Sequence, residues 1–191
     1  MRACERLETG PKVTVGRDSC RAPTVAITLS CVTTKADFAR DEWDSLVRLP
    51  RLVVAAASAA QRDIAYRTNA EVEAGLVASA RGRESKNAFV AAVAAEALRL
   101  FDDKSTLDGV SFGDVEEGII AVLDRAATAN DALRAKASPA DAVAYRAWLV
   151  KIADVVISAA RTGGFLWFGG RRVTEAERRF RDRLAAVLLE G

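Results

Sequence analysis

The sequence predicts an all-α protein, a single bundle of about six helices. Apolar residues recur at spacings of three and four along most of the chain after residue 37, which is the periodicity of amphipathic helices. Short, strand-free connections separate these stretches, as in a compact helical bundle. Half of the 191 residues are hydrophobic and 28% are charged, an ordinary balance for one globular domain with a real core.

Residues 1–33 differ from the rest of the chain. They hold all three cysteines and two of the four prolines, with no helical period. Residues 23–29 have the composition of a strand, but an isolated strand has nothing to pair with. We therefore expect residues 1–33 to be a mobile N-terminal extension and residues 34–191 to form the helical bundle domain.

Two helices are expected between residues 37 and 60. The first carries Phe38 and Trp43 on its apolar stripe and should stop at Pro50, because proline disfavours the helical conformation of the residue before it. The apolar run from Leu52 to Ala60 would be a second, buried helix, in which Ser58 bonds to its own backbone. Residues 61–69 are polar and are expected to be a loop.

The middle of the chain predicts three more helices. Residues 71–81 form a weaker pattern that ends at Gly82, and residues 87–101 form a strong one. A third helix should be opened by Ser111 as the capping residue with Asp114 three positions later, and should end before Ser138.

A long helix should start at Ser138, where Pro139 fits the first helical position and Asp141 faces the positive end of the helix dipole. Residues 147–160 are apolar on nearly every face, which predicts a central helix. Lys151 and Asp154 are expected to pair on one face of it. The helix should end at Gly163, since glycine accepts the left-handed conformation that closes helices.

The last helix is predicted from a capping box in which Thr174 and Glu177 satisfy each other's backbone amides. Its apolar side repeats every four residues, and we expect it to lie on the core. The residues of that side are Ala176, Phe180, Leu184 and Leu188.

An aromatic loop separates these two helices. Two pairs of glycines enclose Phe165, Leu166, Trp167 and Phe168, and Arg171 and Arg172 follow. A plug buried in the bundle is the simpler interpretation. In the alternative, the loop offers aromatic anchors to a second copy, to another protein or to a membrane surface. Exposure of four large apolar side chains would invite association, so this alternative implies a homo-oligomer or a protein partner.

The amino-acid composition excludes several kinds of chemistry. The chain has no histidine, which removes the usual general bases, histidine-activated nucleophiles and histidine metal ligands. A net charge of +2 gives no case for nucleic acid binding. No apolar run is long enough for a transmembrane segment, and no signal-peptide pattern opens the chain, which favours the cytoplasm. We expect no cofactor and no catalytic residues.

Acidic residues near Asp108, Asp114 and Glu116 are the only candidates for a metal site. Their spacing does not match a calcium-binding EF-hand loop. A solvated loop followed by a helix start, where acidic side chains suit the dipole, is the simpler interpretation.

One pattern occurs twice in the chain. Residues 110–114 and 173–177 both read valine, serine or threonine, two variable residues and an acid, each after an apolar helix and a glycine-containing loop. Duplication of a helix–loop–helix unit would produce this repetition. The capping preferences of helix starts would produce it equally well.

Residues 163–170 and 173–177 resemble a group of small bacterial helical proteins with the motif Gly-Gly-Phe-Leu-x-Phe-Gly-Gly followed by Val-(Ser/Thr)-x-x-Glu. Trp43, Leu49 and Pro50 resemble the opening helix of that group. Residues 108–111 are more distantly similar to the Asp-Gly loop of the TerB-like tellurite-resistance domains. That resemblance implies a helical fold, a stress response and metal binding through acidic loops. Arg171 and Arg172 depart from it, since acidic residues would be expected there.

The sequence therefore favours a non-enzymatic interaction or structural protein, self-associating through residues 163–170. A TerB-like stress-response protein that binds a metal is one alternative. A small-molecule-binding protein or enzyme with a pocket between helices is another.

Overall fold

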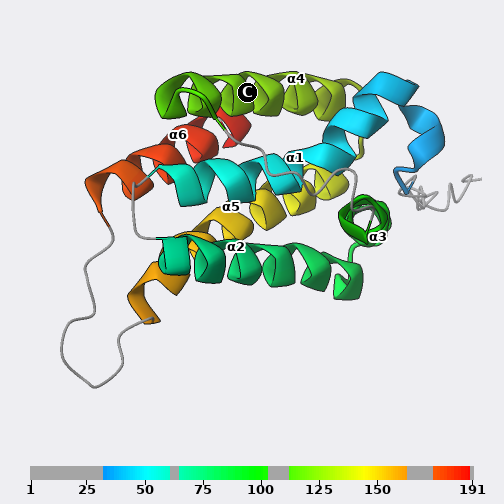
Figure 1. The fold of residues 1–191 in the computed structure, drawn as a ribbon. Coiled ribbons are helices and arrows are strands. Elements are labelled where there is room, and N and C mark those ends of the chain that lie inside the picture. Colours follow the sequence, from blue (N-terminus) through cyan, green and yellow to red (C-terminus); the bar gives the residue numbers. More distant parts are fainter. Residues whose placement is uncertain (1–31, 61–64, 103–111, 163–173, 190–191) are drawn as a thin grey trace, which may run out of the picture.

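A computed structural model describes residues 32–60, 65–102, 112–162 and 174–189 of the chain. Over these ranges the protein forms six α-helices and two short 3-10 helices, with no strand (Figure 1). The predicted all-α bundle of about six helices is confirmed. The bounds are η1 (Lys35–Asp37), α1 (Arg40–Ala59), α2 (Ala65–Ala80), η2 (Arg81–Glu84), α3 (Ala88–Asp102), α4 (Val115–Lys136), α5 (Pro139–Thr162) and α6 (Glu175–Leu189).

Helix α1 runs without a break through Pro50, so the prediction of two helices separated there is wrong. Proline has no N–H, which leaves the carbonyl of the residue four positions earlier without its helical partner. That residue is Leu46, and the hydroxyl of Tyr145 on α5 donates to its carbonyl over 2.7 Å. Leu46 and Tyr145 are both fully buried. A side chain 99 residues away therefore supplies the hydrogen bond that the proline removes.

The boundaries of α2 also differ from the prediction. The polar stretch expected to be a loop over residues 61–69 is helical from Ala65 onward, and residues 61–64 lie outside the described ranges. At its other end, α2 stops at Ala80 and passes into η2, which contains Gly82. Gly82 is buried against α5, since a Cβ atom there would lie only 2.7 Å from the indole ring of Trp148. The predicted break at Gly82 thus coincides with a close packing contact.

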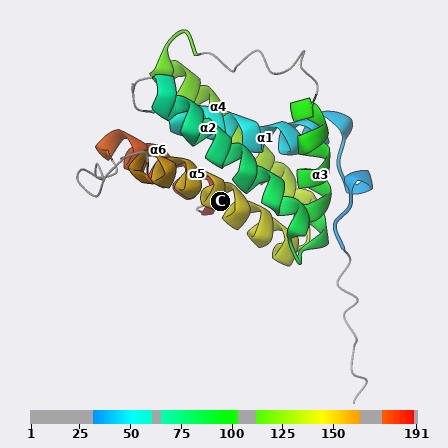
Figure 2. The same ribbon diagram turned by 60° about the horizontal axis from the view of Figure 1, so that its bottom comes forward.

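Two helices occupy the centre of the bundle. Each of α1 and α5 contacts all five other helices, as predicted for α5 from its apolar faces. Figures 1 and 2 show α2 on one side of this pair and α4 on the other, with α3 crossing near one end of the bundle. Gly75 lets α2 approach both central helices closely, because a Cβ atom there would lie 2.6 Å from Val156 and 2.7 Å from Val54.

An aromatic cluster fills the core at the end where α3 and the start of α5 meet. The ring of Phe89 lies 5.8 Å from Phe38, 6.1 Å from Trp43 and 5.9 Å from Tyr145, measured between centroids. These are ordinary distances for favourable ring contacts. Trp148 extends the cluster, with its ring 5.8 Å from Tyr145. Tyr145 is fully buried, and Trp148 is partly exposed but packs against the core.

Candidate functional site

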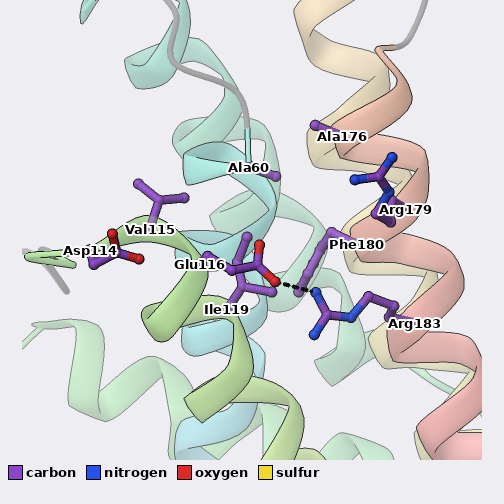
Figure 3. Close-up of a pocket in the computed structure, with 9 residues that line it drawn as sticks. All are labelled: Ala60, Asp114, Val115, Glu116, Ile119, Ala176, Arg179, Phe180 and Arg183. Atoms are coloured by element: carbon purple, nitrogen blue, oxygen red, sulfur yellow. Dashed lines mark hydrogen bonds and ion pairs between the residues drawn. The ribbon is translucent and has the colours of Figure 1, made fainter.

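One end of the bundle holds a cleft between the start of α4, the start of α6 and the end of α1 (Figure 3). We call it the α4–α6 cleft; its volume is about 280 Å³. Its lining residues are Ala60, Asp114, Val115, Glu116, Ile119, Ala176, Arg179, Phe180 and Arg183.

The start of α4 is set by Asp114, whose carboxylate accepts the backbone N–H of Glu117 over 2.9 Å. The prediction that Ser111 opens this helix is wrong, since the helix begins at Val115; Ser111 itself lies outside the described residues. The reason lies in Phe112, whose ring packs against Gly118 in the space that a side chain there would fill. This contact fits a chain that is not yet helical at Phe112.

The start of α6 follows the predicted capping box. The N–H of Thr174 donates to Glu177 Oε2 over 2.7 Å, and the N–H of Glu177 donates to Thr174 Oγ1 over 3.3 Å. Phe180, Leu184 and Leu188 are buried as predicted, but Ala176 is exposed at the rim of the α4–α6 cleft and Glu177 is buried instead.

The repeated sequence pattern marks different positions at the two helix starts. At α6 the capping residue is Thr174, the second position of the pattern, while at α4 it is Asp114, the fifth. The two segments are therefore not equivalent as structural units at their helix starts.

Charged side chains cross the rim of the α4–α6 cleft above an apolar floor. Arg183 on α6 donates to Glu116 on α4 over 2.8 Å, and both side chains keep solvent contact. Arg179, whose side chain is 68% exposed, lies 3.9 Å from Glu175 on its own helix. Phe180 on α6 and Ile119 on α4 are buried beside them, and Figure 3 shows both side chains between the two helices. The cleft therefore combines two arginines with an apolar base.

The candidate metal ligands that the structure describes are bonded to other groups. Asp114 caps α4, and Glu116 pairs with Arg183. Asp108 lies outside the described residues. In the described ranges, no three or more Asp, Glu, Cys or His side chains come together in a way that could hold a metal ion.

The predicted interaction residues Phe165, Leu166, Trp167, Phe168, Arg171 and Arg172 lie outside the described residues. The helices on either side of them are described: α5 ends at Thr162, and α6 begins after Thr174. Residues 103–111 likewise lead toward Asp114. The fold thus connects both stretches singled out from the sequence to helices that start at the same cleft.

Sequence reasoning missed a buried polar cluster toward the other end of α5, formed by Thr33, Asn87, Ser138 and Asp141, which we call the Asp141 cluster. The carboxylate of Asp141 accepts from the Thr33 N–H over 2.9 Å, from Asn87 Nδ2 over 2.6 Å and from Ser138 Oγ over 2.8 Å. The Ser138 N–H in turn donates to Thr33 Oγ1 over 2.8 Å. Thr33, the last residue of the predicted mobile extension, is therefore buried and held; residues 1–31 lie outside the described ranges.

Two opposing effects act on the pKa of the Asp141 carboxyl group. Burial alone would raise the pKa of its carboxyl, but the hydrogen bonds from Thr33, Ser138 and Asn87 stabilise the charged form and hold the pKa below its usual value. The sequence indicated Asp141 only as a residue suited to the helix dipole. Two of its partners, Thr33 and Asn87, come from distant segments, which no local pattern could reveal.

Two further predictions concern side chains outside the cleft. Ser58 donates to the carbonyl of Ala55 over 3.1 Å, which confirms the expected bond to its own backbone. Asp154 accepts from Arg181 Nε on α6 over 3.1 Å, so the ion pair expected with Lys151 is replaced by one that links α5 to α6.

Comparisons with protein-family models, with curated proteins and with solved structures find no match to this chain. The resemblance to TerB-like domains therefore stays a prediction from the sequence. Among the described helices, none has both the length and the apolar character needed to span a membrane.

Proposed function

We propose that this chain is a non-enzymatic interaction protein that self-associates at the end of the bundle that carries the α4–α6 cleft. The observation that supports this proposal is the position of the cleft: residues 163–173 lead directly into the helix whose first turns line it. That segment carries four large apolar side chains and two arginines. Aromatic residues and arginine are the types that dominate binding energy at protein interfaces.

The cleft itself suits a side chain of a partner. Its volume of about 280 Å³ lies below the common range for small-molecule sites, roughly 300–1,000 Å³. Its rim is an exposed ion pair, Glu116 with Arg183, over the buried ring of Phe180. An apolar centre within a polar rim is the usual anatomy of an interface. We also propose the cytoplasm as its compartment.

The experiment is light scattering of the full chain over a concentration series. We expect a dimer or larger species for the wild-type protein, and a folded monomer for Trp167→Ala combined with Phe168→Ser. Val143→Ser is the matched control, because Val143 is an exposed apolar residue near the start of α5 and does not line the cleft. A wild-type protein that is monomeric at every concentration would overturn the proposal.

The same variants separate an interface from a buried plug. Loss of a plug should reduce the free energy of unfolding of the monomer by about 3 kcal/mol or more. Loss of an interface should leave the monomer folded and dissociated. A rise in melting temperature with Ca²⁺ would instead favour the TerB-like metal-binding alternative, which the partners of Asp114 and Glu116 do not favour.

A further inference from the structure

Arg146 on α5 is held in one orientation by a buried amide. Its Nε donates to Asn130 Oδ1 on α4 over 2.7 Å. Asn130 is 2% exposed, and its Nδ2 donates to the carbonyl of Val187 on α6 over 3.1 Å. Because both ends of the amide are bonded, Asn130 has a fixed orientation. It therefore fixes the half-buried guanidinium of Arg146 where α4, α5 and α6 meet.

The positive charge of Arg146 has no carboxylate partner among the described residues. Within the described ranges, its side chain makes one hydrogen bond, to the neutral amide of Asn130. The nearby cations on α4 are paired differently: Arg134 lies 3.2 Å from Asp131, and Lys136 pairs with Glu42 of α1. A guanidinium carries five N–H donors, and one of those of Arg146 is used by Asn130 within the part of the chain that the structure describes.

A second arginine lies on α4, one turn beyond Asn130, and its charge acts on Arg146. Arg134 follows Asn130 by four residues, so it lies on the same face of α4 one turn further on. Burial lowers the pKa of Arg146, and the positive charge of Arg134 lowers it further. The position of Arg134 in the last turn of α4 suits the helix dipole. The position of Arg146 in the first half of α5 has no such explanation.

We propose that Arg134 and Arg146 form a binding site for a phosphate group, either free phosphate or the phosphoryl group of a small organic ligand. Guanidinium groups bind phosphate oxygens through paired, charge-assisted hydrogen bonds. A doubly charged anion would neutralise the two arginines and replace the exposed carboxylate of Asp131 at Arg134. Asn130 orients Arg146 before the ligand arrives, which reduces the entropic cost of binding. This site is separate from the α4–α6 cleft.

Calorimetric titration with inorganic phosphate, at an ionic strength held constant with chloride, tests the site. Arg134→Gln removes an exposed charge that no buried contact requires, so the variant should fold and bind phosphate about tenfold more weakly. Arg146→Lys keeps the charge but loses the planar guanidinium and its Nε bond to Asn130, and should also bind about tenfold more weakly. Arg125→Gln, at an exposed arginine of the same helix, should bind like the wild type.

Titration with phenyl phosphate distinguishes the two sources of the group. Tighter binding than inorganic phosphate would identify an organic ligand, whose apolar part would contact the exposed Val143, three residues before Arg146. Equal or weaker binding would identify free phosphate. No heat with either compound, or equal weakening in Arg125→Gln and Arg134→Gln, would overturn the proposal.

Discussion

The Asp141 cluster and the α4–α6 cleft use acidic residues near helix starts in opposite ways. Asp141 is 6% exposed and accepts hydrogen bonds from three segments of the chain. Glu116, whose side chain is 65% exposed, makes one ion pair with Arg183. A buried acceptor with several donors fixes local structure, because each donor would be unsatisfied without it. An exposed ion pair contributes little to stability and can be exchanged for a partner's charge at small cost.

This difference separates a structural end of the bundle from an end suited to binding. At the Asp141 cluster, Thr33 binds the start of α5, and Asp141 in turn binds Asn87 just before α3. At the α4–α6 cleft, charged groups on two helices face solvent over an apolar floor. Substitutions at the first end should therefore change folding, and those at the second should change association.

The largest effect is expected for Asp141→Ala. It would leave the Thr33 N–H, Asn87 Nδ2 and the Ser138 hydroxyl without their acceptor, and should lower the free energy of unfolding by about 3 kcal/mol. Urea denaturation followed by tryptophan fluorescence measures it. A loss of unfolding free energy below about 0.5 kcal/mol is the range of an exposed ion pair. Such a result would show that the Asp141 cluster and the α4–α6 cleft do not differ in this way.

Tyr145→Phe tests whether a buried hydrogen bond elsewhere in the core contributes to stability as the hydrogen bonds of Asp141 do. It leaves the carbonyl of Leu46 unpaired and should cost about 2 kcal/mol. In Pro50→Ala the backbone N–H returns and can bond to the same carbonyl, so Tyr145→Phe should cost less in that background. A double-mutant cycle measures the coupling energy. Additive effects would show that the tyrosine does not compensate for the proline.

Low pH should weaken the Asp141 cluster in a predictable direction. The pKa of Asp141 is lower in the folded protein than its ordinary value of 3.8, so the carboxylate stabilises the fold fully above that value. This contribution is lost as the pH falls through the lowered folded pKa. The stability difference between the wild type and Asp141→Asn should stay constant above about pH 5 and shrink below it. Denaturation at a series of pH values measures this difference. A difference in the free energy of unfolding that grows as the pH falls would contradict the prediction.

The smallest effect on stability is expected for Arg183→Gln. Its ion pair with Glu116 is exposed and should contribute less than about 0.5 kcal/mol. The dissociation constant of the proposed self-association should nevertheless change, because the pair forms the rim of the α4–α6 cleft. Light scattering of this variant checks that change, with Arg125→Gln as an exposed arginine of the same helical bundle that does not line the cleft. Strong destabilisation without any change in association would reverse the roles assigned to the two ends.

The sequence predicted those features that neighbouring residues determine. Ser138 was identified as a helix start from its own capping side chain, from Pro139 and from Asp141 near the helix dipole, and Thr174 was identified from its capping box with Glu177. The structure shows the N–H of Asp141 donating to Ser138 Oγ and that of Glu177 donating to Thr174 Oγ1. The start of α4 was placed three residues too early, since Ser111 and Asp114 both suit a capping position and the contact of Phe112 with Gly118 is not visible in a local pattern.

The contacts between helices that the sequence did not reveal join distant residues. Thr33 meets Asp141 across 108 positions, and Arg183 meets Glu116 across 67. Both candidate stretches could be recognised by composition, but the meeting of the starts of α4 and α6 at one cleft depends on how α1, α4 and α6 pack. Capping and periodicity are local properties, whereas a site depends on which helix ends the fold brings together.

The bond from Tyr145 to Leu46 also constrains the order in which the chain folds. Residues 40–49 and 51–59 have no local means to satisfy the Leu46 carbonyl across Pro50, so before α5 docks they should behave as two short, interrupted helices. Their union into one helix and the arrival of α5 are then a single cooperative event. A contact of such long range adds a loop-closure cost that slows folding. The two-helix pattern expected from the sequence would thus describe the nascent chain, and the single helix α1 the finished one.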